Sequence, residues 1–132
     1  MTNKQVVNYK KDPLVKGPCA IVAYARLLNG KRPAFDYIEK LQKEDWAKLA
    51  KSFLKIAHIG KIHNIERFRK LHSKSGKIYE FKIHPKIRVL CFQLEKTWLL
   101  THGFDKETDG TPPRQIDRAE QIMKEHISLL QE

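Results

Sequence analysis

Five cationic or titratable side chains fall within or just after three predicted strands, and their residue types suit phosphate chemistry. Lysine and arginine stabilise charge that develops on phosphoryl oxygens, and an imidazole can transfer a proton near neutral pH. Charged groups are costly to bury without a partner, so we expect these side chains to converge on one polar surface. The five residues are Lys82, His84, Arg88, His102 and Lys106.

Less specific roles remain open for some of these residues. Lys82 and Arg88 can pair with Glu80 or face solvent, and His102 can be a satisfied core histidine. Signatures for a phosphate loop, a dinucleotide fold or a zinc protease are absent from the sequence. The six histidines show no paired ligand spacing, and Cys19 and Cys91 lie far apart. We therefore predict neither a metal site nor a cofactor.

The charge of the chain is positive and unevenly distributed. Its 132 residues carry a net charge of +11. Residues 55–96 hold 11 Lys and Arg against 3 Asp and Glu, whereas residues 97–132 hold 4 against 7. Clustered cations favour nucleic acid as a partner because their binding releases counterions from phosphates. A solvated basic surface is the alternative reading.

Three consecutive segments have the pattern of β-strands, at Ile78–His84, Ile87–Leu94 and Thr97–Phe104. In the first segment, apolar residues alternate with Glu80, Lys82 and His84, which predicts a sheet with one apolar and one polar face. The second segment is the most apolar and is expected to be central.

Two helices are predicted between Pro33 and Gly60, because apolar residues recur there at the 3.6-residue period. Glu44 and Asp45 favour the start of the second helix, and Gly60 favours its end. The two helices should form a hairpin. A last helix is expected after Thr111, which would supply a hydroxyl cap, and its core face is lined by Ile116, Ala119, Met123, Ile127 and Leu130.

Two short elements are predicted before Pro33. Gln5–Tyr9 is predicted to be a short first strand, and Pro18–Gly30 a short extra helix near residues 18–29. Residues 61–76 are left without a prediction. The length suits one α+β domain spanning residues 1–132. No apolar run approaches the ~20 residues of a membrane span and the N-terminus lacks a secretory apolar core, so we expect a cytoplasmic protein.

Four segments together resemble a known family in their order and spacing. They are YEFKI, IRVLCF, LLTHGFDKETDGTP and IDRAEQIMKEH, and NGKRPAFDYIEKL with LAKSFLKIAHIG precede them. Across roughly residues 29–126 the chain is similar to toxins of the RelE/ParE superfamily, closest to the HigB-like, phage-derived branch. The resemblance implies a RelE-like α+β fold, a small antiparallel sheet packed with an N-terminal helical hairpin and a C-terminal helix.

The resemblance also implies a function and a site. Such proteins are toxins of type II toxin–antitoxin systems, and they cleave messenger RNA on the ribosome by metal-independent attack of a ribose 2′-OH. Their partners are mRNA, the ribosome and a cognate antitoxin protein. By motif position, Arg88, Lys106 and Lys82 carry the catalytic cations. His84 and His102 are the proton-transfer candidates because an imidazole can serve as base or acid near neutral pH, with His84 ahead of His102. The expected RNA contacts around them are Lys74, Lys77, Lys86 and His102.

The sequence departs from the family pattern at several positions. Ile87 and Cys91 replace tyrosines on either side of the Arg88 strand segment, and Asp105 and Glu107 dilute a basic loop. Lysine at position 82 lacks the planar fork with which an arginine grips phosphate. Two alternatives therefore stay open: a non-catalytic member that binds nucleic acid or protein, and a ParE-like inhibitor of DNA gyrase.

Overall fold

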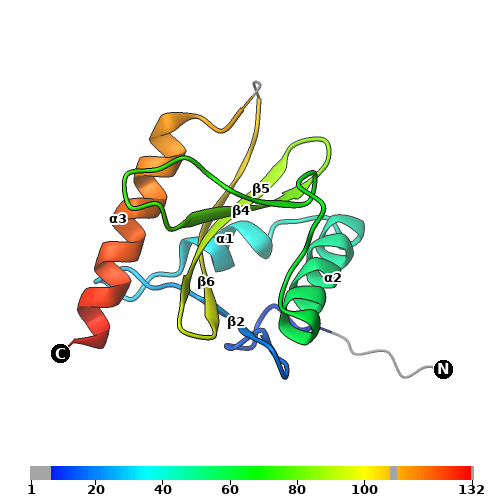
Figure 1. The fold of residues 1–132 in the computed structure, drawn as a ribbon, viewed down its shortest axis with the longest axis horizontal. Helices are drawn as coiled ribbons and strands as arrows, with labels where there is room; N and C mark the ends of the chain where they lie inside the picture. Colours follow the sequence, from blue (N-terminus) through cyan, green and yellow to red (C-terminus); the bar gives the residue numbers. More distant parts are fainter. Residues whose placement is uncertain (1–6, 108–109, 132) are drawn as a thin grey trace.

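The computed structural model describes residues 7–107 and 110–131, and these residues form a six-stranded mixed sheet with helices on both faces (Figure 1). The spatial strand order is β1-β2-β6-β5-β4-β3. Neighbouring strands are antiparallel except β2 and β6, which are parallel. The strands are β1 (Val15–Lys16), β2 (Ile21–Tyr24), β3 (Phe68–Lys70), β4 (Ile78–Ile83), β5 (Ile87–Leu94) and β6 (Thr97–Asp105).

The described residues contain three helices, α1 (Pro33–Ile38), α2 (Lys43–Ile59) and α3 (Pro113–Leu130). Glu44 and Asp45 lie in the first turn of α2, and Gly60 ends this helix in a left-handed conformation with φ of 93°. None of these helices is long and apolar enough to cross a membrane.

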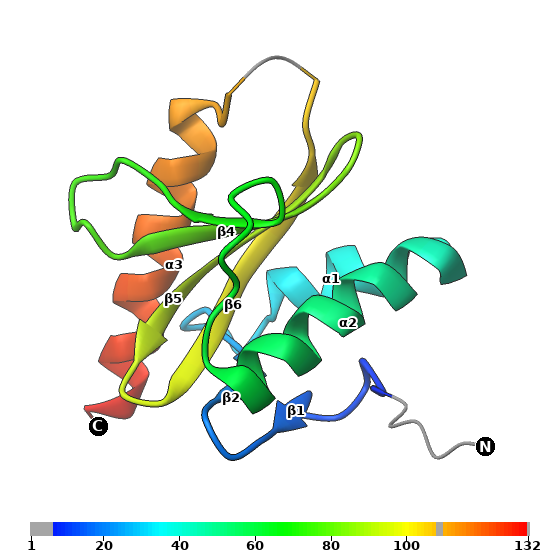
Figure 2. The ribbon, with the colours of Figure 1, turned by 45° about the vertical axis from the view of Figure 1, so that its right-hand side comes forward.

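The sheet separates two apolar cores. The turned view in Figure 2 shows α1 and α2 on one side of the sheet and α3 on the other. On one face, α1 and α2 bury residues such as Phe53 against Phe81, whose ring centroids are 5.0 Å apart. On the other face, α3 buries Ile122 and Met123 against Leu90 and other apolar residues of the strands. Alternation along the strands supplies both faces.

Most predicted elements between Pro33 and the C-terminus are confirmed. The second strand has the predicted bounds, and the first and third differ by one residue at their C-terminal ends. The helix pair and the last helix are also present. Residues 61–76, which had no prediction, contain the edge strand β3. The α+β class is confirmed, and the sheet is larger than predicted and mixed rather than purely antiparallel.

The prediction of a helix at Pro18–Gly30 is wrong, because residues Ile21–Tyr24 form strand β2. Ile21 pairs with Thr97 and Tyr24 with Leu100 on the parallel neighbour β6. Alternate residues of this segment are buried, so its apolar composition serves a strand inside a sheet. The strand predicted at Gln5–Tyr9 is also wrong for residues 7–9, which form no strand. The first two residues of this prediction, 5 and 6, lie outside the described residues.

The predicted division into an apolar and a polar face is wrong for most of the sheet. The face that carries Glu80 also carries Leu90 and Phe92, and α3 covers its apolar half. Polar residues are confined to the end of this face near the turn between β4 and β5. This end is where the candidate site lies.

Candidate functional site

Two rungs of the sheet bring the polar residues together on the face that α3 partly covers. In the first rung, Lys82 of β4 lies opposite Arg88 of β5, and Arg88 lies opposite Phe104 of β6. In the second rung, Arg69, Glu80, Leu90 and His102 lie opposite one another in turn across the four strands from β3 to β6. The sheet register thus places the predicted pair Lys82 and Arg88 side by side.

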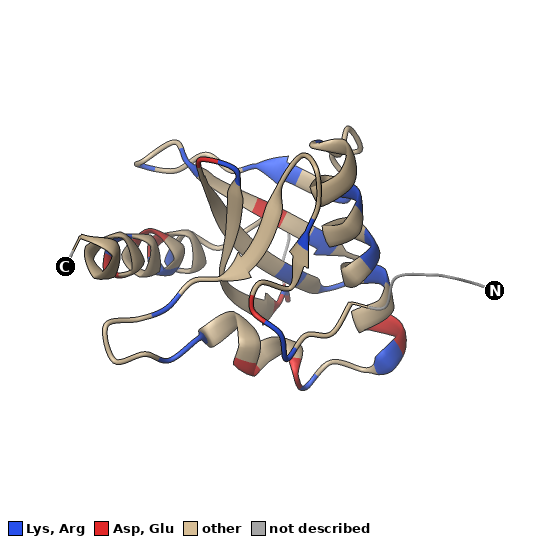
Figure 3. Ribbon diagram, turned by 90° about the horizontal axis from the view of Figure 1, so that it is seen from below, with Lys and Arg blue, Asp and Glu red and all other residues tan. Residues whose placement is uncertain are grey.

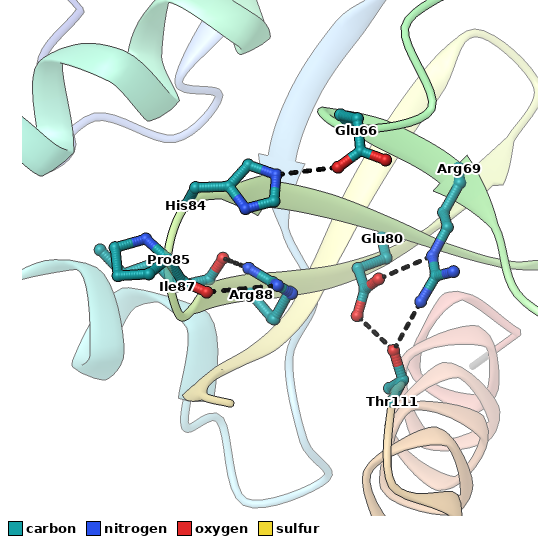
Figure 4. A network of polar contacts seen from close by, with 8 residues as sticks. All are labelled: Glu66, Arg69, Glu80, His84, Pro85, Ile87, Arg88 and Thr111. Carbon is teal, nitrogen blue, oxygen red and sulfur yellow. Dashed lines mark hydrogen bonds and ion pairs between the residues drawn. The ribbon is translucent and has the colours of Figure 1, made fainter. Parts of the chain in front are cut away.

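Arg88 is almost completely buried, with 2% of its surface exposed. Its Nη1 donates a hydrogen bond to the carbonyl oxygen of Ile87 at 2.9 Å, and its Nη2 reaches that of Pro85 at 3.5 Å (Figure 4). Within the described residues, no carboxylate lies at ion-pair distance from this guanidinium. A buried cation held by carbonyl oxygens alone favours the approach of an anion.

Glu80 does not pair with Lys82 or Arg88. Its carboxylate is fully buried, and its Oε1 accepts a hydrogen bond from Arg69 Nε at 3.1 Å. Thr111 Oγ1 donates to Glu80 Oε2 at 2.6 Å, and Arg69 Nη2 donates to Thr111 Oγ1 at 3.3 Å. Figure 4 shows the three side chains closing a small polar network in front of the first turn of α3. We call these three residues the Glu80 network.

The predicted helix cap is therefore wrong. The N-cap residue of α3 is Pro112, and no side chain caps the helix. The Thr111 hydroxyl is used by Glu80 instead. A buried carboxylate gains more from a donated hydrogen bond than an exposed helix end does, since water can solvate the helix end.

His102 has the environment of a structural histidine, which was the alternative reading of this residue. It is 1% exposed, and its Nε2 lies 2.9 Å from Gln115 Oε1 of α3. Its Nδ1 lies 3.2 Å from Thr101 Oγ1. Burial lowers the pKa of His102 to about 4, the Gln115 hydrogen bond opposes this shift and the Arg118 charge adds to it. Because His102 is buried, neutral and engaged at both nitrogens, it is unsuited to contacting RNA in this structure.

The other predicted residues near this end of the sheet lie around the rung of Lys82 and Arg88. His84 follows β4 and is exposed, with Nε2 3.2 Å from Glu66 Oε1, toward which it turns in Figure 4. Lys106 follows β6, and its backbone N–H donates to Lys86 O at 2.7 Å. The ammonium of Lys86 lies 3.9 Å from Asp105 Oδ2, where both side chains are exposed.

Asp105 also connects α1 to this end of the sheet, through a hydrogen bond with a tyrosine of that helix. Tyr37 OH donates a hydrogen bond to Asp105 Oδ1 at 2.6 Å. Burial and this hydrogen bond raise the pKa of Tyr37 well above its usual value. The acidic residue that dilutes the basic loop thus has a structural partner.

Lys74 and Lys77, two predicted RNA contacts, lie away from Arg88. Both belong to the connection between β3 and β4, and Lys77 precedes the first residue of β4, whereas Lys82 lies near its end. A strand rises ~3.3 Å per residue, so Lys77 and Lys82 are separated by roughly 17 Å. The loop carrying Lys74 lies against α3 instead, where the Ser75 N–H donates to Glu120 Oε2 at 2.8 Å.

Sequence reasoning missed Arg69, Thr111 and the central position of Glu80. Arg69 lies in β3, within residues 61–76, for which there was no prediction. The signal that could have found the Glu80 network is the alternation in β4. Glu80 lies on the same face of β4 as the apolar residue Ile78. If that face is buried, the carboxylate must have a cationic or hydroxyl partner.

Comparison with known proteins places the chain in a family. No curated protein matches the sequence. A family model described as "Phage derived protein Gp49-like (DUF891)" matches residues 32–124. The matched range runs from the residue before α1 through most of α3, and it includes both rungs of the candidate site. This chain therefore belongs to the Gp49-like family of phage-derived proteins, which is part of the RelE/ParE-like toxin superfamily.

Proposed function

We propose that the protein is the toxin of a type II toxin–antitoxin system, with a RelE-like, HigB-related arrangement, and that it cleaves mRNA bound to the ribosome. The observation that carries the proposal is the rung of Lys82 and Arg88, where two cations lie opposite each other on neighbouring strands. Membership of the Gp49-like family supports the toxin role and an antitoxin partner.

The charge of the molecule supports RNA as the substrate. The net charge is +11, and the basic positions concentrate outside α3. Figure 3 shows α3, which runs to the C-terminus, carrying acidic and basic positions together. On α2, Lys48, Lys51 and Lys55 are exposed along one side of the helix. These lysines can contact phosphates at a distance from the reacting bond and strengthen binding to ribosomal or messenger RNA.

The proposed reaction is an intramolecular transfer at phosphorus. The 2′-OH of one ribose loses its proton and attacks the neighbouring phosphorus, and the bond to the 5′ oxygen of the next nucleotide breaks. The leaving oxygen takes up a proton from water, so the products are a 2′,3′-cyclic phosphate and a 5′-OH. Lys82 and Arg88 stabilise the extra negative charge on the non-bridging oxygens. Lys106 approaches from the connection after β6. His84 is the proton acceptor in this scheme because it is exposed at this end of the sheet, unlike His102.

One observation favours a second candidate, a non-catalytic member that binds RNA or a partner protein. Arg88 is 2% exposed, and its guanidinium is directed to the carbonyl oxygens of Ile87 and Pro85. Direct contact with a phosphate requires this side chain to leave at least one of these carbonyls. Binding without cleavage would follow if Arg88 stays in place.

The deciding experiment incubates the purified protein with programmed ribosomes and maps mRNA 5′ ends by primer extension. We expect new ends within codons, and about 100-fold slower cleavage in Lys82→Ala and Lys106→Ala. Lys96→Ala is the matched control, since Lys96 is exposed in the turn between β5 and β6 at the opposite end of the sheet. RNA binding without cleavage would select the non-catalytic candidate. Gyrase inhibition would instead be selected by double-strand DNA breaks in cells that express the protein and keep intact mRNA.

A further inference from the structure

The Glu80 network holds the guanidinium of Arg69 in one orientation. Nε of Arg69 donates to Glu80 Oε1 at 3.1 Å, and Nη2 donates to Thr111 Oγ1 at 3.3 Å. Thr111 in turn donates to Glu80 Oε2 at 2.6 Å, so both carboxylate oxygens are used. Because Glu80 is 0% exposed, its carboxylate cannot exchange these partners for bulk water without cost. The arginine is therefore fixed along one edge of its planar group.

The other edge of the Arg69 guanidinium remains available. An arginine has five N–H donors, and the two hydrogen bonds of the network use one on Nε and one on Nη2. Within residues 7–107 and 110–131, Nη1 takes part in no hydrogen bond or ion pair. Nη1 and the second N–H of Nη2 form the fork with which an arginine binds a phosphate through two parallel hydrogen bonds. The side chain is 37% exposed, so part of it is open to solvent.

Arg69 lies beside the two cations of the neighbouring rung. Glu80 lies opposite Arg69, and Lys82 is two residues further along β4 on the same face. Diagonal neighbours of this kind are about 7–8 Å apart, which is within reach of long side chains. Successive phosphates of an extended RNA strand have a similar separation. Figure 4 shows Glu80 between Arg69 and Arg88, so the three strands β3, β4 and β5 each present a cation on this face.

The type of residue at position 80 also favours a role beyond stability. Burying an ion pair costs desolvation that its attraction seldom repays, and apolar side chains of similar size are often as stable. A glutamate here is explained if it orients Arg69 toward a ligand, because a side chain that is already oriented loses less conformational entropy on binding. The pair has no net charge, so any benefit for binding an anion must come from direct contact with the arginine.

We propose that Arg69 is a phosphate-binding residue, and that its Nη1 and Nη2 bind the phosphate next to the one that reacts at Lys82 and Arg88. Glu80 and Thr111 set the direction of this fork. The identification of the ligand as RNA rests on the proposed function. The contact directs the RNA strand across β3, β4 and β5, and it does not require Arg88 to leave its carbonyl partners.

The test measures binding of a single-stranded RNA oligonucleotide in which every ribose carries a 2′-O-methyl group, so that the attack cannot occur. Its affinity is determined at several salt concentrations for the wild type and two variants. Glu80→Met/Arg69→Met removes the ion pair without changing the net charge, and the apolar replacement of both partners keeps the buried space filled. Arg69→Lys keeps the charge that neutralises Glu80 and loses the fork.

We expect both variants to bind the oligonucleotide about tenfold more weakly. In the double variant, the slope of log affinity against log salt should fall by about 0.7 in magnitude, the value for one phosphate contact on a single strand. Lys70→Gln is the matched control, since Lys70 is the next residue of β3, is exposed and lies on the opposite face. This control should bind within about twofold of the wild type with an unchanged slope.

Wild-type affinity and slope in Glu80→Met/Arg69→Met, or wild-type affinity in Arg69→Lys, would overturn the proposal. A wild-type protein that does not bind the oligonucleotide would overturn it as well. Cleavage on programmed ribosomes is measured separately. A wild-type protein that binds RNA through Arg69 and leaves mRNA on ribosomes intact would remove the proposed cleavage and retain the phosphate-binding role of Arg69.

Discussion

Gly103 of β6 lies against the ring of Tyr37 of α1 so closely that a Cβ atom on Gly103 would overlap three ring carbons, Cδ2, Cγ and Cε2. The same tyrosine donates its hydroxyl hydrogen to Asp105, two residues further along β6. The contact therefore fixes α1 on the strand that ends at Asp105. It also gives a physical reason for glycine between His102 and Phe104.

Replacement of Gly103 by alanine should destabilise the protein by about 1–3 kcal/mol, because the new methyl group forces α1 away from β6. Urea unfolding of the wild type and the variant measures the difference in the free energy of unfolding. The matched control is Tyr37→Ala, which empties the space that the methyl group needs. In that background the added cost of Gly103→Ala should shrink by more than half. An equal cost in both backgrounds would show that Tyr37 is not the obstacle.

The sequence was sufficient to predict those strands whose neighbours in the sheet are also close in the chain. β4, β5 and β6 follow one another through short turns, so alternation and turn residues predicted their bounds to within one residue. β2 was missed because its partner β6 lies more than 70 residues away and the pairing is parallel. Nothing local distinguishes the segment Ile21–Tyr24 from a buried helical turn, since it is apolar on all sides.

The same distinction applies to the candidate site. Lys82 and Arg88 flank one turn, so their proximity could be predicted from the strands alone. The Glu80 network could not be predicted, because it brings Thr111 to a strand residue that lies 31 positions earlier in the chain. The burial of His102 depends in the same way on α3, which supplies Gln115.

The stability of the protein should fall between pH 6.5 and 4 because His102 must charge on unfolding. Its pKa is about 4 in the folded state against 6.5 in the unfolded state, so the unfolded chain binds more protons in this window. The contribution of His102 to the free energy of unfolding is complete above pH 6.5. Roughly 3 kcal/mol of this free energy is lost as the pH falls from 6.5 to 4. Urea unfolding at pH 7.0 and pH 4.5 measures this loss.

His126 contributes in the same direction, because burial and the charge of Arg26 lower its pKa while Asp12 opposes them. Two variants separate the contributions. His102→Gln should have a flatter stability profile across the window, and His126→Gln should retain most of the slope. A histidine NMR titration provides a direct check: a His102 imidazole that protonates near pH 6.5 in the folded protein would contradict its burial under α3.

Replacement of Arg88 by methionine should separate stability from activity. The methionine fills a similar space without a charge, and the loss of two hydrogen bonds to turn carbonyls is offset by the removal of a buried cation. We expect the free energy of unfolding to change by no more than about 1–2 kcal/mol. Cleavage on programmed ribosomes should fall by at least about 100-fold. Wild-type cleavage by Arg88→Met would exclude Arg88 from the reaction.

The two cysteines should differ in their reactivity, and the difference reports on the packing of β5. Cys19 is exposed and its thiol donates to the carbonyl oxygen of His58, whereas Cys91 is fully buried. Burial, with a smaller contribution from the Glu80 charge, raises the pKa of Cys91 well above its usual value. Because the thiolate is the reactive form, a disulfide reagent should label one thiol in the folded protein and two in urea.

Cys19→Ser should abolish the fast labelling and leave the slow labelling unchanged. In that variant the remaining thiol reacts only when β5 is exposed, so its rate measures the opening of the sheet. Gly103→Ala should accelerate this rate, because it loosens α1 from the strand next to β5. Rapid labelling of Cys91 in the otherwise unaltered Cys19→Ser protein would show that β5 is accessible on the face that α1 and α2 cover, and would contradict the buried position of Cys91.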